Sequence, residues 1–331
     1  MANDHLKLNK INNMGDSTLL SILEDNIIEF FDWAFLDKGG FFNISIPTSG
    51  HYGGDKHQLR LVDDPRYTKG QVWEGFRKNW VWQSGLAPSG LDGLITPPIV
   101  GTNHEKPGVS GVWVDDAFYP SDTTGDYSHH VDYFNGRVIF DTAIPTGSKV
   151  QVEHSYKHIN VVYANNIPWL KELQTRTLQP TSSFFDSNKG VWNIPPESRL
   201  QLPAVAIEVV PFRTFKGYQL GGGQWVYTDV LFHCIAEDEV TRNKLVDIFS
   251  LQNDKNVALF DSNRINSSGA FPLDYRGTPV PSALRYPDLL ETYYGGNCRL
   301  SKSTVQEMTM VDSNIFGGVV RVTTDIIKSN I

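Results

Sequence analysis

The clearest periodic pattern of apolar residues lies near the start of the chain, between residues 17 and 36. Apolar side chains recur there at intervals of three and four, which is the spacing of one face of an α-helix. Asp16 or Ser17 can cap its start, and Gly39-Gly40 can supply a left-handed stop. We predict a helix whose wide apolar face is buried against its own domain or a neighbouring subunit. The positions concerned are Leu19, Leu20, Ile22, Leu23, Ile27, Ile28, Phe30, Phe31 and Phe35.

Short apolar segments separated by turn residues follow this helix. Asn135-Gly136 lies between two of them and is typical of a two-residue hairpin turn with positive φ. Residues 149–159 alternate between apolar and polar side chains, which predicts one continuous strand. Several short strands with tight turns indicate a β-sandwich or an extended antiparallel sheet. The strands predicted in this region are residues 41–46, 59–62, 111–114, 128–133, 138–140 and 149–159.

A longer unit runs from Leu202 to Asp261. Its first strand, residues 202–210, is almost continuously apolar, as expected when both faces of a sheet are covered. The glycines Gly221-Gly222-Gly223 then lead into a second strand, 225–236, and a third strand follows at 256–260. Between these two strands we predict a helix over residues 237–251, which begins with acidic residues that suit a helix N-terminus. Its apolar positions, expected to pack on the sheet, are Val240, Leu245, Ile248, Phe249 and Leu251.

The rest of the chain is rich in Pro and Gly. Residues 48–56, 87–111 and 263–297 read as loops, and residues 305–310 and 318–324 as closing strands. The predicted fold class is therefore α+β and mostly antiparallel β, with an N-terminal helix, a central β-sandwich-like module and a C-terminal α+β domain. The predicted divisions are residues 1–110, 111–164 and 165–331.

Composition narrows the class of protein. The chain has 331 residues with 20% charged and 12% aromatic side chains, 28 Gly and 18 Pro, which is typical of a loop-rich β protein. No apolar run approaches the roughly 18 residues of a membrane helix, so we expect a soluble protein. The first residues lack a basic segment followed by an apolar one, so we expect no secretory signal. Cys234 and Cys298 are expected to be reduced, with Cys234 buried, in a protein made in a reducing cytoplasm.

The net charge of −8 is distributed unevenly. Residues 1–164 hold 13 Lys and Arg against 20 Asp and Glu, whereas the remaining residues hold 16 against 17. An acidic first half argues against a grip on a phosphate backbone, because such a grip needs clustered Lys and Arg. It remains compatible with a smooth channel through which DNA passes without sticking.

Two histidine pairs are the first candidates for metal sites. His154 and His158 share one face of the predicted strand but lie about 13 Å apart at roughly 3.3 Å per residue, so they cannot share an ion. We expect both to be surface residues. The adjacent His129 and His130 point to opposite faces of a strand, which prevents both from facing one ion despite the acids nearby. Those acids are Asp122, Asp126 and Asp132.

Other candidate chemistry is weak. Asp115-Asp116 is interpreted as a loop tip, because no spaced set of oxygen ligands for Ca²⁺ follows it. Gly221-Gly222-Gly223 leads into a strand, whereas a phosphate-binding loop leads into a helix, so we interpret it as a hairpin corner. Serine-hydrolase, zinc-protease and paired-cysteine motifs are absent from the sequence. We therefore expect no enzyme, no metal and no cofactor. A metal-dependent hydrolase that uses the histidines is the third hypothesis.

Aromatic residues are dense between Val72 and Gln83, where Trp73, Phe76, Trp80 and Trp82 occur. Tryptophans at this density fill a core or anchor an interface, and we predict a core. The alternative function, a carbohydrate-binding or host-recognition module, would instead use exposed aromatic residues as stacking platforms. Its candidates are Trp73, Trp80, Trp82 and Tyr119.

Taken together, residues 202–261 resemble the core of tail terminator and tail completion proteins of tailed bacteriophages. Residues 131–140, followed by Thr146-Gly147-Ser148 and a Val-Gln-Val strand, look like the β module of virion proteins from contractile-tailed phages. The N-terminal helix with Phe42-Asn43-Ile44 is similar to the start of such neck proteins. The resemblance covers about two thirds of the chain, whereas residues 48–110 and 263–300 depart from a minimal terminator.

This resemblance implies a structural virion protein at the head-to-tail junction. It implies a homo-oligomeric ring, commonly a hexamer, that ends the tail tube or joins the tail to the head. The implied partners are other copies of the chain, adjacent neck or portal-side proteins, and tail tube or sheath proteins, with DNA only as passing cargo and no membrane. By the same analogy, the Gly221 to Gly223 corner and the loop from Ser267 to Pro281 would contact other subunits. Assembly in the bacterial cytoplasm and residence in the virion neck follow from it.

Overall fold

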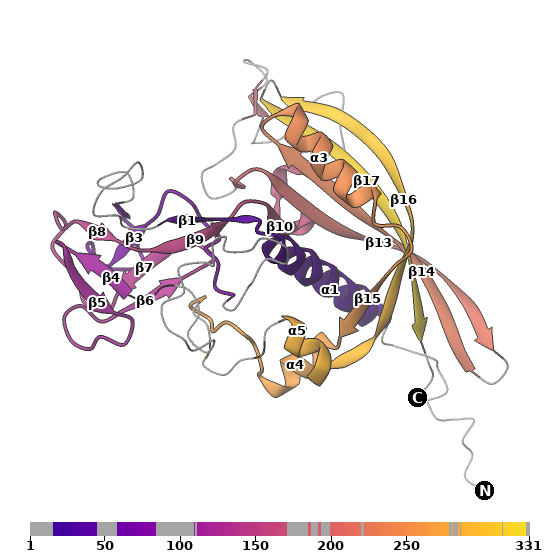
Figure 1. The fold of residues 1–331 in the computed structure, drawn as a ribbon, viewed down its shortest axis with the longest axis horizontal. Coiled ribbons are helices and arrows are strands. Elements are labelled where there is room, and N and C mark those ends of the chain that lie inside the picture. The colour runs from indigo at the N-terminus through magenta and orange to yellow at the C-terminus, as the bar shows by residue number, and fades with distance from the viewer. Residues whose placement is uncertain are drawn as a thin grey trace, which may run out of the picture.

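The computed structural model of the chain has an α+β fold in which antiparallel strands predominate, as the sequence predicted (Figure 1). The predicted loop at 48–56 and almost all of the one at 87–111 lie outside the residues that the structure describes. The described residues are 16–44, 58–83, 109, 111–170, 185–186, 191–192, 199–219, 222–277, 280, 284, 286–312 and 314–328.

Helix α1 (Asp16–Asp37) confirms the predicted N-terminal helix. Ile27 and Phe31 are buried in one core with strands of the largest sheet. Gly39 adopts a positive φ of 81° and donates its N–H to the carbonyl of Leu36, which ends the helix where the sequence predicted. The apolar face of α1 is therefore covered by the chain's own sheet.

Two small antiparallel sheets form the central module and share one hydrophobic core, which makes the module sandwich-like. Trp73 and Trp80 lie in this core, as predicted, and Trp82 packs against it. One sheet has the order β2 (Arg60–Leu61), β3 (Val72–Glu74), β7 (Arg137–Phe140), β6 (His129–Asp132), and the other has the order β5 (Ala117–Pro120), β4 (Gly111–Val114), β8 (Val150–Gln151).

The hairpin predicted around Asn135-Gly136 is confirmed, but its predicted two-residue turn is wrong. Asp132 pairs with Arg137, so the loop has the four residues 133–136, and only Gly136 has a positive φ, of 65°. The Asp132 carboxylate accepts hydrogen bonds from the backbone N–H and the side-chain amide of Asn135, at 3.1 and 2.6 Å. These bonds stabilise the wider loop.

The Asp115-Asp116 tip is a second hairpin turn, and both residues have positive φ, at 48° and 67°. The turn was predicted, but the strand after it, β5, was not. β5 pairs with β4 in register from Val114↔Ala117 to Gly111↔Pro120. Aspartate tolerates the left-handed region better than most residues, which explains why a tight turn forms without glycine.

The single strand predicted at 149–159 is wrong, because the segment is divided between two sheets and the strand that follows it, β10, enters a third. β8 joins the central module, β9 (His154–Lys157) pairs with β1 (Phe41–Ile44), and β10 (Asn160–Tyr163) joins the largest sheet. The alternation of apolar and polar residues is a local signal and carries no information about which sheet each part enters.

The largest sheet has six strands, and all neighbours are antiparallel except the parallel pair β10 and β13. The Gly-rich segment is the predicted hairpin corner, since Gln219 pairs with Gly222 across it. Several strands extend well beyond their predicted ends. Across the sheet the order is β10, β13 (Ala204–Gln219), β14 (Gly222–Ala236), β17 (Ile315–Lys328), β16 (Tyr294–Asp312) and β15 (Lys255–Phe260).

The helix predicted at 237–251 is confirmed as α3 (Glu239–Ser250), which is capped by Asp238. Leu245 and Phe249 are buried as expected, but Val240 and Leu251 are 61% and 77% exposed, because they lie at the two ends of the helix, away from the sheet. The extended loop predicted at 263–297 is also wrong. It contains α4 (Ser262–Ser268), α5 (Tyr286–Thr292) and the start of β16.

The six-stranded sheet is strongly curved and covered on both faces near its middle (Figure 1). On the concave face α1 and α3 meet over the sheet, where Phe31 lies 5.2 Å from Phe232 and 4.9 Å from Phe249 between ring centroids. On the convex face a short 3₁₀ helix (Ala164–Asn166) and Trp169 pack on β13 and β14. A separate short hairpin is formed by β11 (Phe185–Asp186) and β12 (Val191–Trp192).

The two short outer strands leave long edges of their neighbours open. β10 pairs only with Ala204 to Ile207, so residues 208–219 of β13 have no further strand beside them among the described residues. β15 pairs only with residues 294–300, so residues 301–312 of β16 also have no outer strand beside them among the described residues. The two open edges lie at diagonally opposite corners of the sheet.

Candidate functional site

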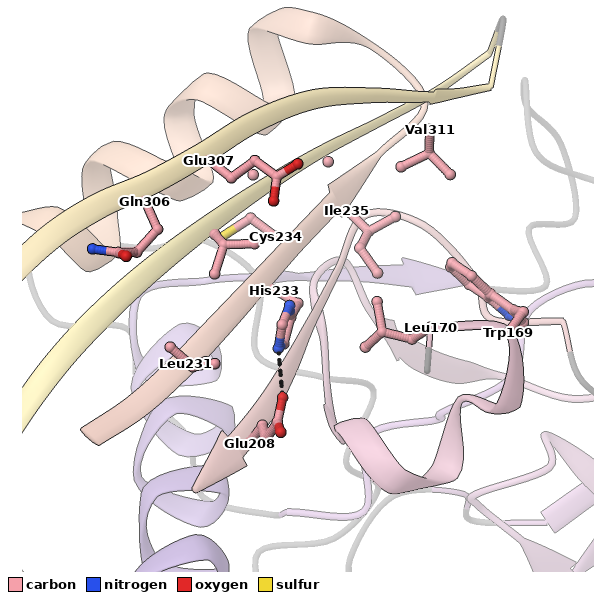
Figure 2. Close-up of a pocket in the computed structure, with 13 residues that line it drawn as sticks. Trp169, Leu170, Glu208, Leu231, His233, Cys234, Ile235, Gln306, Glu307 and Val311 are labelled. Atoms are coloured by element: carbon pink, nitrogen blue, oxygen red, sulfur yellow. Dashed lines mark hydrogen bonds and ion pairs between the residues drawn. The ribbon is translucent and has the colours of Figure 1, made fainter. Parts of the chain in front are cut away.

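A groove of about 400 Å³ lies on the convex face of the six-stranded sheet (Figure 2). It crosses β13, β14, β17 and β16, and the segment after the 3₁₀ helix forms one wall. The groove has a volume within the usual range for a binding site. Its lining residues are Trp169, Leu170, Glu208, Leu231, His233, Cys234, Ile235, Gln306, Glu307, Val311, Gly317, Gly318 and Val319.

One side of the groove is apolar. Trp169, Leu170 and Ile235 are buried in a shared cluster with Ala206. The chain places them there because Ala206 and Ile235 alternate out of β13 and β14 toward the convex face, where the Trp169 segment covers them. This side can hold an apolar side chain of a partner.

The other side of the groove is polar, and Figure 2 shows Glu307, His233 and Glu208 following one another across the strands. The Nε2 atom of His233 lies 3.0 Å from the Glu208 carboxylate, with the imidazole almost fully buried. Glu307 on β16 is exposed. The polar side therefore carries two carboxylates, which favour a cationic partner group.

Cys234 borders the same groove but offers no nucleophile. Its side chain belongs to the core on the concave face and is fully buried, and burial raises the pKa of its thiol far above the ordinary value. Because the thiolate is the reactive form, this cysteine has low reactivity. Cys234 and Cys298 are both free and buried, as expected for a reduced protein.

A projecting hairpin, which we call the β13–β14 arm, is the second candidate surface. It comprises residues 211–217 and 225–228, and Figure 1 shows it running past the helices at the end of the sheet opposite α3. Phe212 is 85% exposed and Phe215 39% exposed. The Lys216 ammonium lies 5.0 Å from the centre of the Tyr227 ring. The arm thus presents apolar and cationic groups together.

The first histidine pair, His129 and His130, lies on β6. His129 is buried and His130 half-buried on alternate faces of β6, as predicted. Burial lowers the pKa of both imidazoles, so their neutral forms are favoured. Within the described residues, His, Cys, Asp and Glu form no group of three or more that could hold a metal ion.

The expectation of two surface histidines at 154 and 158 is half wrong. His158 is exposed, but His154 is buried and stacks on Trp80 with ring centroids 4.0 Å apart. Its Nδ1 atom lies 3.1 Å from the carbonyl oxygen of Val152. His154 therefore fills the core of the central module.

The aromatic residues considered for sugar stacking are largely enclosed. Trp73 and Trp80 are buried in the central core, so neither can present a ring face to a ligand. Trp82 is half-buried against that core, and Tyr119 stacks on Tyr127 at 4.1 Å. Stacking on a sugar needs an open ring face, and the two buried tryptophans do not provide one.

Sequence reasoning missed the groove, and of the arm it predicted only the glycine corner that joins its two strands. Glu208 interrupts the apolar segment 202–210 and His233 interrupts the apolar segment 230–236, and that contrast was the available signal. The pairing that brings them together, Glu208 beside Leu231 and His233 beside Ala206, depends on a strand register that one sequence does not specify.

Comparisons with known proteins place no further constraint on function. No known protein family matches the sequence, and no curated protein matches it. Among the helices that the structure describes, none has the length and apolar character needed to cross a membrane.

Proposed function

We propose that this chain is a structural virion protein of a tailed bacteriophage. Copies of it form a homo-oligomeric ring, a hexamer, in the neck, which ends the tail tube or joins the tail to the head. Its partners are other copies of itself, neighbouring neck or portal-side proteins, and tail tube or sheath proteins. It acts by shape complementarity, without catalysis or cofactor, and resides in the virion after assembly in the bacterial cytoplasm.

The β13–β14 arm is the observation that carries this proposal. The arm buries Val226 in the core of its own subunit, yet it leaves Phe212 and Phe215 exposed at the open edge of the sheet. Exposed apolar residues in a contiguous region mark surfaces that other molecules cover. A repeated subunit that must contact its neighbours has use for such an arm.

The distribution of charge also supports a place around passing DNA. The first 164 residues carry most of the net negative charge, so this part of the chain repels phosphate groups on balance. A ring that lets DNA pass without binding it needs a surface of this kind.

The carbohydrate-binding alternative has weaker support, because Trp73 and Trp80 are enclosed. The hydrolase hypothesis is weaker still, since His129 and His130 point to opposite faces of β6. Both alternatives would leave the arm without a role.

The test is the mass of the purified protein and its place in the particle. We expect a closed oligomer of about six copies by mass photometry or native mass spectrometry, and ring-shaped density at the neck by electron microscopy. A chain that is monomeric both in solution at high concentration and in the particle contradicts the proposal. Tight binding to glycan arrays with no self-association would favour the alternative function.

A further inference from the structure

We propose that the open edge of β13 in one copy pairs antiparallel with the open edge of β16 in the next copy, so that the six-stranded sheet continues from subunit to subunit. This inference rests on the proposed ring and names the contact that builds it. The partner is a second copy of this chain. The pairing joins residues 212–217 to residues 306–311.

The topology supplies two open edges of matching length. Residues 208–219 of β13 and 301–312 of β16 each extend over twelve positions beyond the last pair with an outer strand. Open strand edges are templates for pairing with another chain, and natural proteins usually cover or shorten them. Here the two edges lie on opposite sides of the sheet. One copy's β13 edge can therefore meet the next copy's β16 edge while the sheet order is preserved.

The directions of the strands fit this contact. Successive strands β13, β14, β17 and β16 alternate in direction, so β16 runs opposite to β13. A β13 edge placed beside β16 with the same sheet orientation is therefore antiparallel to it. The contact joins two different surfaces, and such head-to-tail contacts close into a ring when the rotation between copies allows it.

One register matches the side chains on both faces. When Lys216 stands opposite Glu307, Phe215 stands opposite Met308. Lys216 pairs within the subunit with Trp225, which lies on the same face of β14 as the groove residue His233. Glu307 pairs with Val319, which itself lines the groove. Because paired residues project on the same face, both side chains lie on the convex face. Opposite charges directly across an antiparallel pair are favourable.

The apolar pair in this register lies on the concave face. Phe215 pairs with the buried Val226, and Met308 pairs with Gly318, which faces α3. Phe215 and Met308 are 39% and 44% exposed in the single chain. Pairing the two edges would cover both, which removes apolar surface from water.

The edge sequences also agree in charge. Residues 208–219 carry Glu208, Arg213 and Lys216, whereas residues 301–312 carry Lys302, Glu307 and Asp312. The β13 edge therefore has one net positive charge and the β16 edge one net negative charge, which favours pairing of the two different edges over pairing of identical ones. The β16 edge also borders the convex groove, so the added strand would wall that groove on its open side.

A charge swap tests the contact. Lys216→Glu and Glu307→Lys are both at exposed positions, so we expect each variant to fold normally. Each single variant should weaken self-association at least about tenfold by sedimentation, and the double variant should recover to within about threefold of wild type. Lys302→Glu, on the same strand but outside the register, is the control and should change association little.

Disulfide trapping tests the register and detects weak association. Opposed positions in an antiparallel pair have Cβ atoms roughly 4.5–5.5 Å apart, close to what a disulfide needs. The double variant Lys216→Cys with Glu307→Cys should give an intermolecular ladder under mild oxidation. The matched pair Lys216→Cys with Lys302→Cys should give none beyond the single variants.

The outcomes separate the two proposals. If wild type assembles into a ring but the swap shows no recovery and the 216–307 pair gives no ladder, the edge contact is overturned and the ring proposal stands. If the wild-type chain does not associate and forms no ring in the particle, and the 216–307 cysteine variant gives no ladder, both proposals fail.

Discussion

At the scale of single residues, Asn26 on α1 takes the place of a neighbouring strand. Its side-chain amide donates to the carbonyl of Phe260 at 2.8 Å, and its oxygen accepts from the Phe260 N–H at 2.7 Å. Phe260 lies on β15, the last strand of the sheet, so its outward backbone groups have no ladder partner beyond Asn26 among the described strands. One buried amide thus fastens the helix to the sheet edge.

We predict that Asn26→Ala lowers the free energy of unfolding by about 2–3 kcal/mol, because both backbone groups of Phe260 lose a buried partner. Urea denaturation followed by circular dichroism measures the change. Asn263→Ala, at an exposed position on α4, is the matched control and should stay within about 0.5 kcal/mol of wild type. Equal effects of the two substitutions would contradict this role for Asn26.

Glu29 on α1 gives the chain a pH dependence. Burial and the neighbouring carboxylate of Asp32 raise its pKa to about 7, although Lys157 nearby acts in the opposite direction. A raised pKa means that the folded state holds the proton more tightly than the unfolded state. The stabilising contribution is therefore complete below pH 4.5 and is lost as the pH rises toward 7.

Glu29→Gln should remove this slope and raise the unfolding free energy at pH 8 by about 1 kcal/mol, because glutamine needs no charge in the buried site. The measurement is chemical denaturation at a series of pH values from 4.5 to 8. Glu291→Gln, at an exposed position of α5, controls for the loss of one negative charge. An unchanged slope in Glu29→Gln would assign the pH dependence to other groups.

Sequence reasoning at this scale succeeded where a residue's neighbours along the strand decide its environment. The opposite orientation of His129 and His130 follows from strand alternation alone. It failed for His154, whose burial depends on Trp80, a residue 74 positions away on a different strand segment. Periodicity along one strand cannot show which distant ring covers a side chain.

At the scale of elements, the start of α3 is fixed by an N-cap that can be recognised from the local sequence. The Asp238 carboxylate accepts the backbone N–H of Thr241 at 2.8 Å, and this bond lowers the pKa of Asp238. The acidic start of this helix was predicted from sequence. The capping bond places the first turn of α3 directly after β14.

Asp238→Ala should lower the melting temperature by a few degrees, because the first turn of α3 loses its cap. Asp238→Asn should retain most of the stability, since the amide oxygen can accept the same bond. Asp247→Ala, an exposed change in the middle of α3, should have a smaller effect. Thermal unfolding by calorimetry at pH 7 compares the three variants. A melting temperature of Asp238→Asn as low as that of Asp238→Ala would argue against the cap.

The elements that the sequence predicted well are those with strong local periodicity, such as α1 and α3. Strand lengths were predicted poorly. β16 spans nineteen residues through polar positions such as Lys302 and Gln306, because its neighbour β17 supplies pairing along its length. The existence of α4 and α5 was also missed, since both helices have only seven residues and lie among Pro and Gly. Tertiary pairing overrides such weak local preferences.

At the scale of the whole molecule, α1 and the C-terminal sheet form one core although more than 160 residues separate them in sequence. Phe31 is 3% exposed and contacts both Phe232 and Phe249. The first part of the chain therefore contributes to the core of the last. This connection could not be predicted, because the wide apolar face of α1 fits its own sheet and a neighbouring subunit equally well.

We predict that Phe31→Ala costs about 3–5 kcal/mol, since it removes a large ring from the point where α1, α3 and the sheet meet. Hydrogen exchange should show α1, β14 and β17 losing protection together. Phe42→Ala, at a 48% exposed position, is the control and should leave protection in the sheet unchanged. Loss of protection confined to α1 would show that the sheet core is independent of the helix.

The meeting of Phe31 with Phe232 and Phe249 also has a consequence for how the chain is made. A ribosome adds roughly 5–20 residues per second, so α1 emerges some 10–40 seconds before the partners that cover its apolar side. During that interval Leu23, Ile27 and Phe31 have no native surface to bury against, because the sheet that covers them is not yet synthesised. The nascent chain therefore exposes this apolar face until the sheet is synthesised, and we expect it to be prone to aggregation during that interval.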